Sequence, residues 1–306
     1  MYARRSFLAT LGGIASACAE RERRPPPRGP VRGAAISAAP TPAIVRTIEV
    51  LDWTFASEMG GPKRATVLVP RPTPDKLPVL VALHGLGETT DPVTGANAWP
   101  KSYALQRAYE RMLEPPLHPD DFQNLVTSER LSEINESLIK RALGGVIVAC
   151  PYLPKDIGGG VPMELYGQWL GERLLPRVRS ELPVSSDVRA TGIDGVSLGG
   201  WAAIRIGMLR PDLFGVVGAL QPAIVDNAMV DWAVSLLAQN LKGRPFRFVT
   251  STEDLYRGTL TELDKRLTGK GIPHEFAMTP GPHDYPWNKG PGSIEMLLWQ
   301  DRALRG

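Results

Sequence analysis

The chain has 306 residues, of which 43% are hydrophobic, and a formal net charge of only +3. That length can bury a sizeable core without disulfides, and it suits one large domain better than a string of small modules. Part of the positive charge lies in the first 32 residues, and acidic and basic residues alternate along the rest, as on ordinary solvated faces. The composition therefore argues against a nucleic-acid-binding protein.

Residues 1–18 are typical of an export signal. The twin arginine Arg4-Arg5 precedes a short apolar run, which resembles the signals that send folded proteins across a membrane. Residues 15–17, directly before Cys18, resemble a bacterial lipoprotein cleavage site, although its first position usually carries leucine. We predict export by a twin-arginine type signal to the periplasm, the cell envelope or the outside. Lipidation of Cys18 as a membrane tether is left open, and the alternative is a soluble protein with a basic N-terminus.

Residues 19–45 are rich in proline, arginine and alanine and hold few large apolar side chains. Such a stretch cannot bury enough surface to order itself, so we predict a linker. The second of the chain's two cysteines, Cys150, ends an apolar run and is interpreted as a buried small hydrophobe. No structural disulfide is predicted.

From residue 46 onward, short apolar runs alternate with amphipathic segments. Runs that are apolar almost throughout are typical of strands buried on both faces of a parallel sheet. The predicted strands are 46–55, 64–70, 77–85, 144–152, 188–197, 214–222, 245–254 and 273–281, and the predicted helices are 163–182, 199–211, 227–241, 257–271 and 292–305. This pattern predicts an α/β fold with about eight strands, mostly parallel, and helices on both faces.

One segment, 88–143, is far longer than a crossover between two strands needs. It follows the third predicted strand and has helical patterns of its own. We expect it to form extra helices above the strand ends, where a cap over a site would lie.

The stretch GVSLG places Ser197 between Gly195 and Gly199, after an apolar run and before a helical pattern. This is the G-x-S-x-G nucleophile elbow, in which a sharp turn from strand to helix lifts the serine above the sheet. The N–H of Leu198 would then lie at the helix N-terminus, where a developing oxyanion is stabilised. The alternative is a tight turn that happens to carry a serine.

A serine nucleophile needs a base and an acid that orients the base. Of the four histidines, His283 follows the last predicted strand, where the base belongs in the chain order serine, acid, histidine. His274 begins the preceding strand, and His118 lies in the inserted segment. His84 is the alternative base, although its place before a glycine suits a role in shaping the loop.

The acid should follow a strand downstream of the elbow, and the stretch STED offers Glu253 and Asp254. Asp254 is the preferred acid because it lies just before the next helix, and Glu253 is the alternative. Either carboxylate could also cap that helix. The loop after the third strand is expected to supply a second oxyanion donor, the N–H of Leu86 or Gly87.

The motifs LHGLG, GVSLGGWAA, STEDLY and GPHDYPWN occur in this order within residues 46–306. With them the chain resembles the esterase D and feruloyl-esterase-like esterases. The resemblance implies an α/β-hydrolase fold and acyl transfer by a triad of Ser197, His283 and Asp254, without a metal or organic cofactor. The insertion departs from the family pattern, so the resemblance does not assign the substrate.

The predicted function is hydrolysis of a small-molecule or carbohydrate ester. Four aromatic residues are candidates for a sugar- or aryl-binding platform, with core packing as the alternative: Trp99, Tyr152, Tyr285 and Trp287. For a fifth, Trp201, which follows the elbow on the predicted helix, core packing is preferred. A thioesterase, peptidase or acyltransferase with the same triad is an alternative function, and so is a non-catalytic surface binding protein of this fold. The sequence leaves the oligomeric state open.

Overall fold

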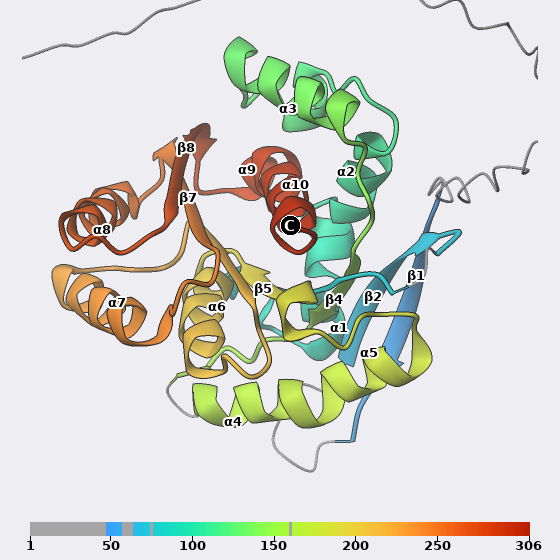
Figure 1. The fold of residues 1–306 in the computed structure, drawn as a ribbon, viewed down its shortest axis with the longest axis horizontal. Coiled ribbons are helices and arrows are strands. Elements are labelled where there is room, and N and C mark those ends of the chain that lie inside the picture. The colour runs from blue at the N-terminus through green and yellow to red at the C-terminus, as the bar shows by residue number, and fades with distance from the viewer. Residues whose placement is uncertain (1–46, 57–63, 74–75, 159–160) are drawn as a thin grey trace, which may run out of the picture. The chain divides into compact units, whose positions relative to one another are not determined.

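A single mixed sheet organises the computed structural model (Figure 1). Among residues 47–56, 64–73, 76–158 and 161–306, which the structure describes, eight strands form this sheet in the order β1-β2-β4-β3-β5-β6-β7-β8. The strand β2 is antiparallel to both of its neighbours, and the remaining pairs are parallel. The strands are β1 (Thr47–Thr54), β2 (Arg64–Arg71), β3 (Val79–Leu83), β4 (Ile147–Pro151), β5 (Thr191–Gly195), β6 (Val216–Leu220), β7 (Phe246–Glu253) and β8 (Glu275–Pro282).

The predicted fold class is confirmed, since each predicted strand is present within a few residues of its expected bounds. The central strands β3, β4, β5 and β6 are buried along their whole length. Their near-continuous apolar runs follow from this burial on both faces. The predicted export signal and linker, with the twin arginine and Cys18, lie outside the described residues and stay predictions. No helix among the described residues is long and apolar enough to cross a membrane.

Helices cover both faces of the sheet (Figure 1). One face packs against α4, α5, α6, α7 and α8, and the other against α2, α3 and α10. The helices are α1 (Pro92–Ala96), α2 (Leu105–Met112), α3 (Ser128–Lys140), α4 (Met163–Trp169), α5 (Leu175–Glu181), α6 (Leu198–Leu209), α7 (Asn227–Asn240), α8 (Arg257–Gly269), α9 (Tyr285–Trp287) and α10 (Ser293–Ala303). Shorter turns are η1 (Leu86–Glu88), η2 (Ala98–Ser102), η3 (Pro119–Phe122), η4 (Leu170–Leu174), η5 (Val188–Ala190) and η6 (Asn288–Gly292).

The insertion 88–143 is helical, but most of it does not form the expected cap. The helices α2 and α3 pack in one apolar cluster with α10 and one face of the sheet. Tyr109 of α2 donates its hydroxyl to the carbonyl of Val146, 2.8 Å away, at the amino end of β4. The helix α2 therefore runs down the face of the sheet, away from the carboxyl ends of the strands, because its apolar stripe is buried there. The expectation of a cap is wrong for α2 and α3.

A buried carboxylate lies under the turn that follows β5. Asp194 accepts hydrogen bonds from the N–H of Gly195 (2.8 Å) and from the side-chain amide of Gln300 (3.0 Å). A Cβ at Gly218 on the neighbouring strand would overlap this carboxylate, so glycine there makes room for it. Burial raises the pKa of Asp194 to about 6, because the charged form loses its hydration and gains no close ion pair.

The raised pKa makes Asp194 a source of instability at neutral pH. The folded protein holds the proton more tightly than the unfolded chain, whose Asp pKa is about 3.8. Stability is therefore lost as pH rises from about 4 to about 6. We expect Asp194→Asn to raise the free energy of unfolding by up to about 3 kcal/mol at pH 8 and by about half as much at pH 5.

Urea unfolding of both proteins at the two pH values measures this difference. The oxygen Oε1 of Gln300 has no partner, so its amide can turn to meet the new asparagine. A stabilisation that is equal at pH 5 and pH 8, or absent at both, would contradict a raised pKa.

Candidate active site

The turn between β5 and α6 holds Ser197 in a strained backbone conformation. Its φ is 57° and its ψ is −117°, a region that residues with a side chain seldom occupy. Its N–H donates to the carbonyl of Leu220 at 2.9 Å, and its carbonyl accepts from the N–H of Ala223 at 3.0 Å. The segment after β6 thus fixes the serine from both sides.

The two glycines of the motif are required by the close approach of strand and helix. A Cβ at Gly195 would lie 2.5 Å from the carbonyl oxygen of Gly199, and a Cβ at Gly199 would lie closer still to the carbonyls of Leu83 and His84. Any side chain there would push β5, α6 and the end of β3 apart. A tight turn that merely happens to carry a serine would not need glycine at both Gly195 and Gly199.

His283 and Asp254 contact each other after β8 and β7. The His283 Nδ1 lies 2.9 Å from Oδ1 of Asp254, and the Asp254 side chain is fully buried. The carboxylate also accepts from the hydroxyl of Thr250 (2.7 Å) and the N–H of Tyr256 (3.0 Å). With three donors the carboxylate is held in one orientation, and it leaves the other ring nitrogen of His283 free to act.

The loop after β8 crosses above the carboxyl ends of the neighbouring strands. Gln221, which follows β6, donates its amide to the carbonyl of Pro282 at 3.2 Å. Tyr285 donates its hydroxyl at 2.5 Å to Glu88, which follows β3. Because β3 is four positions from β8 in the sheet, roughly 19 Å at the usual strand spacing, this loop passes over β5 and its elbow. His283 is carried on this loop.

The neighbouring acid Glu253 is exposed, and its side chain makes no hydrogen bond or ion pair with a described residue. Thr252 and Glu253 are both exposed at the end of β7, whereas Asp254 is buried. The geometry brings only Asp254 to His283.

His84 is fully buried and uses both ring nitrogens within the scaffold. Its Nε2 accepts from the N–H of Leu153 (2.8 Å), so Nδ1 carries the hydrogen and donates to the carbonyl of Gly85 (2.8 Å). Burial lowers the pKa of His84, since the charged ring would lose its hydration. The residue therefore joins the loops after β3 and β4 as a neutral ring and has no nitrogen left to serve as a base.

The remaining two histidines lie elsewhere. His118 begins the short turn η3 in the inserted segment. His274 directly precedes β8, and its Nε2 lies 2.9 Å from Oδ1 of Asp264 on α8. It therefore lies at the amino ends of the parallel strands, whereas the elbow lies at their carboxyl ends.

Backbone N–H groups suited to an oxyanion lie beside the serine. A Cβ built on Gly85 would lie 3.7 Å from Cβ of Ser197, so the loop after β3 borders the elbow. The N–H groups of Leu86, Gly87 and Leu198 donate to no acceptor among the described residues. The structure leaves open whether Leu86 or Gly87 would serve as the second donor.

The aromatic residues singled out from the sequence divide into two pairs. Trp99 and Trp287 are fully buried, and their indole N–H groups donate to the carbonyl of Leu83 (2.9 Å) and the hydroxyl of Thr279 (2.8 Å). Neither ring has a free face, so the expectation of a binding platform is wrong for both. They are core residues that brace the strands next to the site.

Tyr152 and Tyr285 keep access to solvent. The hydroxyl of Tyr152 donates to the carbonyl of Thr89 (3.1 Å), and Tyr285 is 47% exposed beside the loop of η1. Sequence reasoning missed Tyr256, whose ring meets that of His283 edge-on at 5.4 Å, although it stands in the quoted motif STEDLY. It also missed Glu88, one residue beyond the motif LHGLG.

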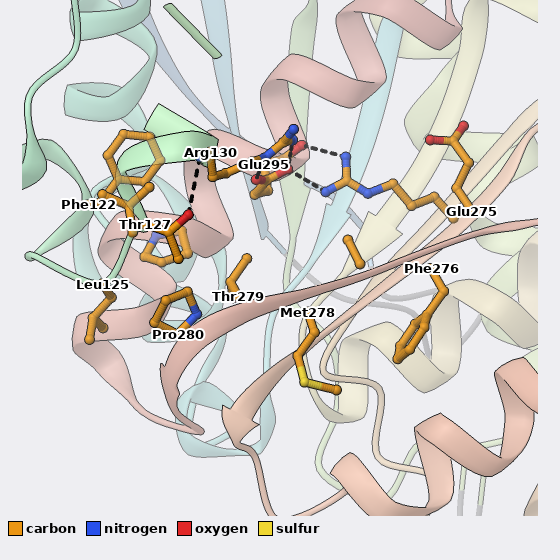
Figure 2. Close-up of a pocket in the computed structure, with 14 residues that line it drawn as sticks. Phe122, Leu125, Thr127, Arg130, Glu275, Phe276, Met278, Thr279, Pro280 and Glu295 are labelled. Carbon is orange, nitrogen blue, oxygen red and sulfur yellow. Dashed lines mark hydrogen bonds and ion pairs between the residues drawn. The ribbon is translucent and has the colours of Figure 1, made fainter. Parts of the chain in front are cut away.

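A separate groove of about 260 Å³ lies between β8 and the segment that leads into α3 (Figure 2). Ser197, Asp254 and His283 are not among its lining residues. Glu295 of α10 stands at its base with two arginines, and its carboxylate contacts Arg130 Nε at 2.7 Å and Arg247 Nη2 at 2.5 Å. Burial alone would raise the pKa of Glu295, but the two guanidinium groups bring it below its usual value.

This ion pair is expected to stabilise the fold without serving the active site. Glu295→Gln leaves the buried Arg247 without its counterion and should lower the free energy of unfolding by roughly 3–5 kcal/mol at pH 7. Because the folded pKa of Glu295 lies below the unfolded value of 4.5, the wild-type protein loses this stabilisation as pH falls below 4.5. The difference in free energy of unfolding between wild type and variant should therefore become smaller. Urea unfolding at pH 7 and pH 4 tests both points, and equal stability at pH 7 would contradict them.

Comparison with known proteins places the fold. Residues 151–288, which include the elbow, Asp254 and His283, match a family model described as "Putative esterase". No curated protein matches the sequence. A ferulic acid esterase is similar in structure, with a TM-score of 0.63 and 18% identity over 85% of this chain and 99% of that one.

Two further solved structures are similar. The S-formylglutathione hydrolase of Staphylococcus aureus has a TM-score of 0.57 and 14% identity over 83% of this chain and 99% of that one. The feruloyl esterase module of Clostridium thermocellum has a TM-score of 0.57 and 12% identity over 84% of this chain and 89% of that one. Together with the strand order and the elbow, these similarities show an α/β-hydrolase fold. The match of residues 151–288 to this esterase model indicates, more particularly, a carboxylic ester hydrolase.

Proposed function

We propose that the protein is a serine esterase in which Ser197 is the nucleophile, His283 the base and Asp254 the orienting acid. The observation that carries the proposal is the 2.9 Å contact between His283 Nδ1 and the buried Asp254 carboxylate, on a loop that crosses above the elbow. A hydrogen on Nδ1 donated to Asp254 leaves the lone pair of Nε2 to accept the serine proton.

The reaction then proceeds in two halves. Ser197 attacks the ester carbonyl as His283 takes its proton, and the tetrahedral oxyanion accepts hydrogen bonds from the N–H groups of Leu198 and Leu86. Collapse breaks the bond to the alcohol, which leaves with the proton from His283, and an acyl-enzyme remains on the serine. Water, deprotonated by His283, attacks the acyl group. Collapse then breaks the bond to Ser197, which regains its proton from His283, and the carboxylic acid leaves the free enzyme. No step requires a metal or organic cofactor.

The surface around the elbow favours an uncharged substrate. Exposed apolar side chains stand on the loops that follow four different strands: Leu86, Val225, Leu255 and Tyr285. Arg257, a basic residue that follows β7, donates to the carbonyl of Thr252. The carboxylates of Asp254 and Glu88 are buried and already accept hydrogen bonds.

A charged group on the substrate would lose water here and find no partner. Two of the similar structures described above are named as a ferulic acid esterase and a feruloyl esterase module, and one as an S-formylglutathione hydrolase. We propose that this protein acts on uncharged carboxylic esters, such as acylated carbohydrate or small aryl and alkyl esters.

Substitution of the two adjacent acids tests the triad. Ser197→Ala should abolish ester hydrolysis, and Asp254→Asn should lower kcat roughly 10³–10⁴-fold because His283 loses the acceptor that fixes its tautomer. Glu253→Gln is the matched control, since it neutralises an exposed carboxylate one residue away and should leave kcat unchanged. Kinetics with 4-nitrophenyl acetate measure all three, and a larger loss in Glu253→Gln than in Asp254→Asn would overturn the assignment of the acid.

Two esters with one leaving group test the preference for uncharged substrates. We expect kcat/KM for 4-nitrophenyl butyrate to exceed that for 4-nitrophenyl hemisuccinate by about tenfold or more, because the carboxylate must shed water without a counterion. Spontaneous hydrolysis of each ester supplies the correction for intrinsic reactivity. Equal values, or faster turnover of the hemisuccinate, would show a cationic subsite that contradicts the proposal.

A further inference from the structure

Glu88 is a buried carboxylate that the triad does not use. It lies at the end of η1 with 3% of its surface exposed. One oxygen accepts the hydroxyl of Tyr285 at 2.5 Å, and the other accepts the hydroxyl of Tyr103. Two phenols from segments far apart in the chain therefore meet on a single acid.

The second tyrosine extends this contact to the backbone beside the nucleophile. The oxygen of Tyr103 accepts from the N–H of Gly85 at 3.2 Å, and Gly85 borders Ser197. The turn is closed by Thr89, which donates both its N–H (3.2 Å) and its hydroxyl (2.8 Å) to the carbonyl of Leu86. The N–H of Gly85 is thus engaged, whereas the N–H groups of Leu86 and Gly87 donate to no acceptor among the described residues.

Both phenols donate to the carboxylate of Glu88 and keep their hydrogens at neutral pH. The hydrogen bond to Glu88 raises the pKa of Tyr285 to about 12, and burial, together with Glu88, also raises the pKa of Tyr103. A phenol has one hydrogen, and in each case Glu88 accepts it. Neither hydroxyl is left to donate to an oxyanion directly, so the group acts through the loop it holds.

We propose that Glu88 is a positioning residue: with Tyr103 and Tyr285 it ties the oxyanion loop (residues 85–88) to the loop of His283. The proposal rests on the proposed function, since it assigns these residues to the assembly of that same site. A carboxylate is needed because two acceptor oxygens must face two donors. Glutamine has one acceptor oxygen, and its NH₂ would face a second donor.

The test compares Tyr285→Phe with Tyr109→Phe, using hydrolysis of 4-nitrophenyl butyrate and thermal unfolding. Tyr285→Phe removes one hydroxyl from a residue that is 47% exposed, so Tm should change little. It should lower kcat roughly ten- to hundredfold with KM within about twofold, because a displaced N–H donor weakens binding of the transition-state oxyanion and not of the bound ester. Tyr109→Phe removes a buried hydroxyl that bonds Val146 on the face of the sheet. It should lower Tm and leave kcat unchanged.

A double-mutant cycle extends the test to the acid. Glu88→Gln should lower kcat at least as much as Tyr285→Phe. The double variant should be no slower than Glu88→Gln alone, because both substitutions remove the same contact between Glu88 and Tyr285. Unchanged kcat in Tyr285→Phe would overturn the proposal. So would a raised KM at unchanged kcat, which would make Tyr285 a substrate contact, or additive losses in the cycle.

A wrong assignment of Ser197 and a wrong assignment of Glu88 give different kinetic results. If Ser197→Ala retains the wild-type rate, the serine esterase assignment fails. If Ser197→Ala is inactive while Tyr285→Phe matches the wild type, only the role of Glu88 fails. Should Glu88→Gln not fold, the Tyr285→Phe comparison still decides, because the Tyr285 residue is 47% exposed and its substitution leaves the core intact.

Discussion

The close approach of β5, α6 and the end of β3 is the constraint on which the rest of the site depends. No side chain fits at Gly195 or Gly199, where the backbones of neighbouring elements occupy the place of a Cβ. The chain can turn within this space only if Ser197 takes a left-handed φ of 57°. The cost of that strain, of order 1–3 kcal/mol, is offset by packing of β5 and α6 in the buried core, and it leaves the hydroxyl at the carboxyl edge of the sheet.

The other groups of the site reach this edge through hydrogen bonds between loops that follow different strands. Gln221 binds Pro282, Asp254 binds His283, and Glu88 binds Tyr285. The buried acids differ according to their donors. Asp254 accepts from three groups and is proposed to act as a carboxylate, whereas Asp194 has only amide donors, and burial raises its pKa to about 6. The two buried acids therefore differ in role. Asp254 is the proposed catalytic acid, and Asp194 is a structural residue beneath the elbow.

The strands and the elbow could be predicted because their signals are local. A run such as residues 79–83 is apolar throughout because both of its faces are covered, and the motif G-x-S-x-G reflects a backbone contact within a few residues. Burial of Trp99 and Trp287 depends on elements distant in sequence, so a sequence pattern could not separate core from platform. The positions of the helices of the insertion could not be predicted for the same reason, because their apolar faces pack against elements distant in sequence. Glu88 and Tyr285 are 197 positions apart, and no local pattern marks them as a pair.

Labelling with a fluorophosphonate, followed by peptide mass spectrometry, tests the central claim that Ser197 is an activated nucleophile. The probe phosphonylates a serine only where a base removes its proton, and it requires no knowledge of the natural ester. We expect one adduct, on the peptide that contains Ser197, and its loss in His283→Ala at unchanged folding. An adduct on another residue, or labelling of Ser197 that persists in His283→Ala, would contradict the account.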